Sequence, residues 1–68
     1  MFVGIGWYKV LREMYINGRH LSQNMEVYVP QVIVNEDLDL SSATIRINGY
    51  EEFRIPIKEF IKKYKYIK

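Results

Sequence analysis

The sequence predicts a small, mostly β domain of the α+β class, in which about five short antiparallel strands pack with one short C-terminal helix. Two Asn-Gly pairs lie between apolar runs, β-branched and aromatic residues are plentiful, and one stretch near the C-terminus has helical spacing. For this order and length we expect a small SH3-like or OB-like barrel, or a rolled antiparallel sheet. All 68 residues are expected to form one domain, 1–68.

The first Asn-Gly pair, at positions 17 and 18, is typical of a two-residue hairpin turn, because both residue types tolerate positive φ. Such a turn places Tyr15 opposite His20. Further out, it places Trp7 opposite Tyr28. One face then collects mostly apolar residues: Tyr8, Val10, Met14, Ile16, Leu21, Met25 and Val27. The other face is polar with aromatics: Trp7, Lys9, Leu11, Glu13, Tyr15, His20, Ser22, Asn24, Glu26 and Tyr28. This separation predicts a half-buried antiparallel pair.

A helix over residues 7–15 is the competing interpretation of the same segment. Several of its apolar residues also have helical spacing, and Gly18 would follow as a C-cap. However, no Ser, Thr, Asp or Asn precedes the segment to cap its first turn. The hairpin also accounts for more residues, so we favour it.

The second Asn-Gly pair, at positions 48 and 49, predicts another hairpin. A three-residue loop over 47–49, with Gly49 left-handed, gives its strands a common inner face of Ala43, Ile45, Phe53 and Ile55. The outward residues are then Thr44, Arg46, Glu52 and Arg54. Before this hairpin, Pro30 indicates an edge, a bulge or a break in the β segment 27–34. Residues 35–42 are expected to form an acidic loop.

The C-terminal segment predicts a helix over about 56–66. Pro56 suits a first helical turn. The apolar stripe has i, i+3, i+4, i+7 spacing and consists of Ile57, Phe60, Ile61 and Tyr64. Lysines follow near the end, where the helix dipole favours positive charge.

Several classes of chemistry lack the residues they need. The chain has no cysteine and one histidine, His20, which excludes disulfides, thiolate zinc sites and His-rich metal sites. The acidic loop lacks the ligand spacing of a calcium-binding EF-hand, and the glycines form no phosphate-binding loop. We therefore expect no metal, cofactor or small-molecule substrate, and no enzyme. An enzyme whose site is shared between subunits is kept as a third class.

Hydropathy and charge give few further constraints. No apolar run approaches the ~20 residues of a membrane span, and the apolar segment 1–7 lacks the basic start and cleavage site of a signal peptide. We expect a cytoplasmic protein with no membrane partner. A net charge of +2 is too small to imply a nucleic-acid partner by itself.

The function favoured by the sequence is a non-enzymatic protein–protein interaction module. The candidate interface is the aromatic side of the first hairpin: Trp7, Leu11, Tyr15, His20 and Tyr28. A core of this size supplies perhaps ~3–5 kcal/mol, so self-association as a homo-oligomer would add useful buried surface. Heavy use of Ile, Lys, Tyr and Asn is typical of AT-rich coding, which fits a small viral or mobile-element protein that binds and inhibits a host factor.

The alternative function is nucleic-acid binding by a small β-barrel that uses its basic C-terminal tail. Lysines and arginines can neutralise phosphates, and tyrosines can stack on bases. The residues expected to do this are Arg46, Arg54, Lys62, Lys63, Lys65 and Tyr66.

Overall fold

The computed structural model describes residues 4–68; the first three residues of the predicted domain lie outside this range. The described chain contains seven strands, one 3₁₀ turn (η1) and one α-helix, in the order β1 (Gly6–Val10), β2 (Met14–Ile16), β3 (Arg19–Leu21), β4 (Glu26–Ile33), η1 (Leu38–Leu40), β5 (Ser42–Ile47), β6 (Glu51–Pro56), α1 (Ile57–Lys63) and β7 (Tyr64–Tyr66). The expected mostly β composition with one short helix is confirmed.

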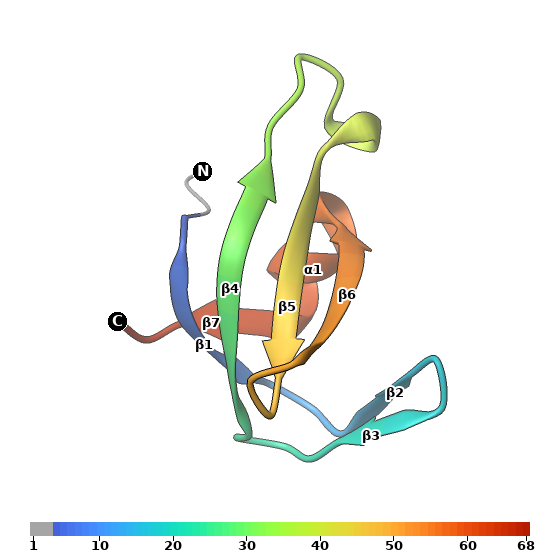
Figure 1. Cartoon of the computed structure of the whole chain (residues 1–68). Coiled ribbons are helices and arrows are strands. Elements are labelled where there is room, and N and C mark those ends of the chain that lie inside the picture. The colour runs from blue at the N-terminus through green and yellow to red at the C-terminus, as the bar shows by residue number, and fades with distance from the viewer. Residues whose placement is uncertain (1–3) are drawn as a thin grey trace.

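Five strands form one antiparallel sheet in the order β6-β5-β4-β1-β7, and β2 and β3 form a separate two-stranded ribbon (Figure 1). The sheet is rolled, as one of the two expected architectures required. The closed SH3-like or OB-like barrel is not formed, because the two outermost strands, β6 and β7, are connected through α1 and do not pair with each other. In Figure 1, α1 lies behind the sheet, at the level of β5 and β6.

The core lies between the inner face of the sheet and α1. Its fully buried side chains come from most elements: Val10, Leu21, Val27, Val29, Ala43, Ile45, Ile47 and Phe60. The Phe60 ring is central, since it packs edge-to-face on Tyr8 at 4.8 Å between centroids and stacks on Tyr64 at 4.9 Å. The apolar face expected for the first hairpin is thus buried or packed against the core.

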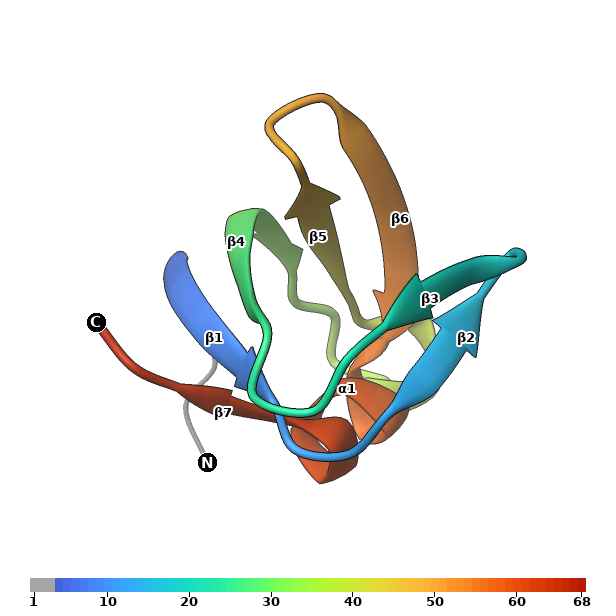
Figure 2. The same cartoon turned by 90° about the horizontal axis from the view of Figure 1, so that it is seen from below.

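The register of the first hairpin is confirmed, and the helix over 7–15 is wrong. Tyr15 pairs with His20, and Trp7 pairs with Tyr28. The predicted single ladder is nevertheless broken into two, β1–β4 and β2–β3. The break is a bend in which Asn24 adopts a φ of 69° and its backbone N–H donates to the Val10 carbonyl at 2.7 Å. The ribbon therefore leaves the plane of the sheet (Figure 2).

The second hairpin has the expected faces but a different turn. The loop comprises residues 48–50 rather than 47–49, so Ile45 faces Phe53 rather than Glu51. This register keeps Ile47 in β5, where its side chain is 1 % exposed and adds to the core. Thr44, expected to point to solvent, is also buried, because strands β4 and β6 flank it on both sides.

The connection before β5 was predicted to be an acidic loop over residues 35–42, but it contains the 3₁₀ turn η1, and residue 42 already belongs to β5. β4 continues through Pro30 with a bulge between Tyr28 and Gln31, as one of the predicted alternatives required. After it, Asp37 caps η1 by accepting a hydrogen bond from the Asp39 backbone N–H at 2.9 Å. The Ser41 hydroxyl accepts from the Asn35 N–H at 2.8 Å. Short polar side chains thus satisfy the backbone donors of this segment.

The C-terminal helix ends at Lys63, so the prediction that it reaches residue 66 is wrong. Residues 64–66 form β7, which pairs with β1 and places Lys9 opposite Lys65. The pairing satisfies backbone groups of β1 that a longer helix would leave unpaired. Tyr64 still reaches the core, whereas Ile61 of the expected stripe is 36 % exposed. Within residues 4–68, no helix has both the length and the apolar character that a membrane crossing requires.

Gly6 allows the end of the chain to lie against β1. Its φ is +150°, and an added Cβ would lie 2.8 Å from the Lys68 carbonyl oxygen and 2.8 Å from Cε1 of Tyr66. Beside it, the Trp7 N–H donates to the Lys68 carbonyl at 2.8 Å. The ladder between β1 and the C-terminus therefore requires a residue without a side chain here.

Replacing Gly6 should consequently destabilise the fold. We expect Gly6→Ala to lower the free energy of unfolding by about 2–4 kcal/mol, from backbone strain and steric overlap together. Gly18→Ala is the control: its φ is +81° and nothing lies within 4 Å of an added Cβ, so only strain of about 1 kcal/mol applies. Urea unfolding of both variants measures the difference, and equal losses would contradict the account.

Tyr64 should make stability depend on alkaline pH. Burial raises the pKa of Tyr64 from 10.0 to about 12. The unfolded chain loses this proton near pH 10 whereas the folded chain keeps it, so the free energy of unfolding falls as pH rises from about 10 to about 12. Between urea titrations at pH 8 and at pH 11, the free energy of unfolding should therefore fall less for Tyr64→Phe than for wild type. Tyr50→Phe, at an exposed turn position, should behave as wild type.

Candidate functional site

A row of four side chains crosses the outer face of the sheet. Trp7 on β1 pairs with Tyr28 on β4, Tyr28 pairs with Arg46 on β5, and Arg46 pairs with Glu52 on β6. Alternation along each strand places all four on the side opposite the core. We call this set the aromatic row: Trp7, Tyr28, Arg46 and Glu52.

Contacts along the aromatic row hold its members in place. The rings of Trp7 and Tyr28 meet edge-to-face, with centroids 5.3 Å apart and planes at 60°. The Arg46 guanidinium carbon lies 5.9 Å from the centroid of the Tyr28 ring, a cation–π distance. Arg46 Nε and Nη2 both donate to Glu52 Oε2, at 2.9 and 2.7 Å. The row is therefore preorganised although it faces solvent.

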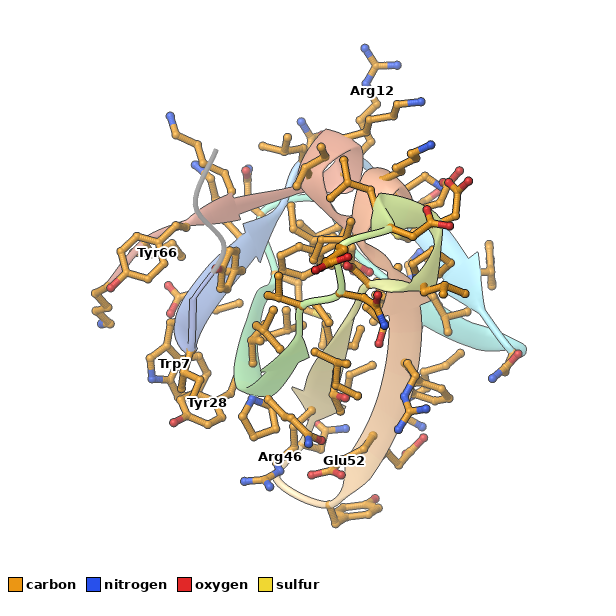
Figure 3. The ribbon with its side chains drawn as sticks, turned by 90° about the horizontal axis from the view of Figure 1, so that it is seen from above. Trp7, Arg12, Tyr28, Arg46, Glu52 and Tyr66 are labelled. Atoms are coloured by element: carbon orange, nitrogen blue, oxygen red, sulfur yellow. The ribbon has the colours of Figure 1, made fainter. Side chains whose placement is uncertain are left out.

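A shallow depression of ≈ 450 Å³ adjoins the row. It is lined by Trp7, Glu26, Tyr28, Arg46, Asn48 and Gly49. Figure 3 shows Trp7 and Tyr28 side by side, with Arg46 and Glu52 further along the same side of the molecule. Trp7 remains 40 % exposed and Tyr28 is half-buried. The depression thus combines aromatic surface with the Glu26 carboxylate and the Arg46 guanidinium.

The five residues of the predicted interface do not form one surface. Trp7 and Tyr28 belong to the aromatic row, whereas Tyr15 and His20 lie on the β2–β3 ribbon. Both views place this ribbon on the far side of the molecule from β1 (Figures 1 and 2). Leu11 follows β1 and lines a different depression, near the end of α1. The bend that breaks the first ladder causes this division.

On the ribbon, Tyr15 and His20 form a small exposed cluster. Their rings are 5.0 Å apart, and His20 Nε2 lies 2.9 Å from Glu13 Oε2. His20 was predicted as part of the candidate interface, and no partner other than Tyr15 was predicted for it. The hairpin register could have indicated Glu13, since it lies two residues from Tyr15 and thus diagonally opposite His20. Tyr15 itself is 68 % exposed.

Arg46 and Glu52 were predicted to face outward, but their place beside Tyr28 was not predicted. That neighbourhood depends on how β4 pairs with β5, and the two strands are separated by residues 34–41 and a bulge at Pro30. No local turn fixes such a register.

The six residues of the nucleic-acid alternative are also dispersed. Arg46 is engaged by Glu52, and Arg54 lies on the edge strand β6. Lys62 and Lys63 are on α1, which lies on the opposite side from Arg46 in Figure 3. Lys65 and Tyr66 are successive residues of β7, so their side chains point to opposite faces. These six residues do not form one basic surface.

The remaining ionisable groups outside these surfaces are mostly solvated. Among residues 4–68, no three His, Cys, Asp or Glu side chains gather as a metal ion would require. A hydrogen bond from Lys63, with Nζ 3.1 Å from the carboxylate, lowers the pKa of Glu59. This is an exposed pair one helical turn apart on α1, typical of a solvated helix surface.

Comparisons with protein-family models, with curated proteins and with solved structures returned no match for this chain.

The Arg46–Glu52 pair should contribute little to stability. Its side chains are 37 % and 45 % exposed, and exposed ion pairs typically contribute about 0.2–1 kcal/mol. A double-mutant cycle with Arg46→Ala and Glu52→Ala should therefore give a coupling within that range by urea unfolding. A coupling above about 2 kcal/mol would assign Arg46 to the stability of the fold rather than to its surface.

Proposed function

We propose that this chain is a non-enzymatic protein–protein interaction module that self-associates through the aromatic row. One observation supports this most directly: Trp7, Tyr28 and Arg46 lie in register on an outward sheet face beside a depression. Trp, Tyr and Arg are the residue types that most often dominate binding energy at protein interfaces. The proposal retains Trp7 and Tyr28 from the interface predicted by sequence and adds Arg46.

The contacts that hold the side chains of the aromatic row in place favour binding. Ring–ring and cation–π contacts already restrict the side chains, so association costs less rotamer entropy than it would for free side chains. Trp7 still has apolar surface to lose to a partner. Most of the gain would therefore come from covering Trp7 and the adjacent depression.

A second copy of the chain is the partner that fits the charges. The depression carries a carboxylate at Glu26 and a cation at Arg46, with the aromatic rings among its lining residues. Around a two-fold axis, a contact from Glu26 of one copy to Arg46 of the other is made twice, and there Glu26 would join Glu52 on the same guanidinium. The small core also gains from additional buried surface. An unrelated protein, such as a host factor bound by a small viral or mobile-element protein, is the other occupant to test.

Self-association should depend on the row and not on exposed aromatics in general. Size-exclusion chromatography with light scattering should give a dimer mass for wild type that shifts toward monomer in Trp7→Ala and Tyr28→Ala. The control is Tyr50→Ala, since Tyr50 is 75 % exposed at the β5–β6 turn and lies outside the row. Circular dichroism checks that every variant remains folded.

A wild-type protein that stays monomeric at high concentration would overturn the proposal of a second copy. So would a Tyr50→Ala variant that dissociates as readily as Trp7→Ala.

A further inference from the structure

A second surface lies at the other end of β1, around the end of α1. Five of the chain's ten lysines and arginines gather there, and we call them the basic strip: Lys9, Arg12, Lys62, Lys63 and Lys65. From this strip we infer a binding site for the phosphate backbone of a nucleic-acid duplex. The strip adjoins the aromatic row at Lys9, which shares the outward face of β1 with Trp7, and its other members lie after β1, on α1 and on β7. The inference does not depend on self-association.

Backbone pairing between β1 and the C-terminal segment brings the strip together. Lys9 and Lys65 are direct register partners. One step further, the Leu11 N–H donates to the Lys63 carbonyl at 2.9 Å, which continues the ladder into the end of α1. Arg12 and Lys62 then line the same depression of ≈ 460 Å³ as Lys63, together with one carboxylate, Glu13, which lies 2.9 Å from His20 Nε2. Figure 3 shows Arg12 beside α1, on the far side of the molecule from Arg46 and Glu52.

The cations of the strip are mostly not neutralised within the protein. Among residues 4–68, only Lys63 of the five has a carboxylate within 4.0 Å, from Glu59. Of the five lysines and arginines outside the strip, Arg19, Arg46 and Lys58 are each paired with an acidic residue. Lys9 lies opposite Glu26 on β4 but opposite Lys65 on β7, and like charges directly opposite each other destabilise a sheet. An anionic ligand would relieve that repulsion.

The dimensions and chemistry of the strip favour a duplex backbone. Lys9 and Arg12 are three residues apart, so their backbones lie at most roughly 11 Å from each other, a distance that covers two or three successive phosphates. The residues that line the depression at the end of α1 include no aromatic side chain, and single strands are usually held by aromatic stacking. Tyr66, expected in the sequence-based alternative, points to the opposite face from Lys65. Phosphate contacts alone predict binding without base-sequence preference.

A membrane or an acidic protein fits this surface less well. The end of α1 is concave, whereas a bilayer is flat on this scale. The strip's exposed apolar neighbours, Leu11 and Ile61, each retain only 36 % exposure, so little apolar surface is available for insertion. An acidic protein interface would ordinarily add aromatic anchors, and none lines the depression at the end of α1.

The test is binding of a fluorescently labelled 20-base-pair DNA duplex at several salt concentrations. Wild type should bind at low salt, with an affinity that falls steeply as salt increases. The variant Arg12→Gln/Lys65→Gln should flatten the logarithmic salt slope by about 2, since each lost phosphate contact changes it by about 0.9. The matched control, Arg19→Gln/Arg54→Gln, removes the same charge from exposed or half-buried positions outside the strip. It should keep the wild-type slope.

Several outcomes would overturn the inference. The inference fails if wild type does not bind the duplex at low salt. It also fails if the strip variant and the control variant weaken duplex binding equally, because the loss would then follow from net charge and not from the position of the cations. Tighter binding to a single strand, to polyglutamate or to vesicles of anionic phospholipid than to the duplex would assign the strip to a different partner.

Discussion

The pairing of β1 with β4 on one side and β7 on the other is the constraint on which the structure depends. It directs Tyr8 and Val10 into the core and leaves Trp7 and Lys9 outside. The C-terminal segment is thereby brought alongside β1, at the cost of a close approach that only Gly6 permits. Because side chains alternate along a strand, a slip of one residue would exchange the core and the outer surface of β1.

Both proposed surfaces follow from this one strand. Trp7, near its start, begins the aromatic row, and Lys9, two residues later, begins the basic strip. The row is preorganised by ring and ion-pair contacts, whereas the strip consists of cations with few internal partners. The aromatic row suits contact with a protein, because its apolar surface loses water there. The basic strip suits contact with a polyanion, because the pairing of its cations with phosphates releases counterions.

Local signals in the sequence account for what could be predicted. Asn-Gly turns and alternation fixed the register of the first hairpin and the faces of the second. The helix end was missed because Tyr64 serves equally as the last position of a helical stripe and as an inward residue of β7. The place of Arg46 beside Tyr28 was missed because a bulge and a connection of several residues separate their strands. Non-local pairing, which assembles both surfaces, leaves no short-range pattern to read.

The register of β1 is tested most directly by nuclear Overhauser contacts in solution. The account predicts contacts between the Trp7 indole and the Tyr28 ring, and between the Tyr8 and Phe60 rings, whose centroids lie 5.3 and 4.8 Å apart. Contacts from the Trp7 indole to Phe60 instead would show that Trp7 belongs to the core. That result would contradict the account and remove the aromatic row with it.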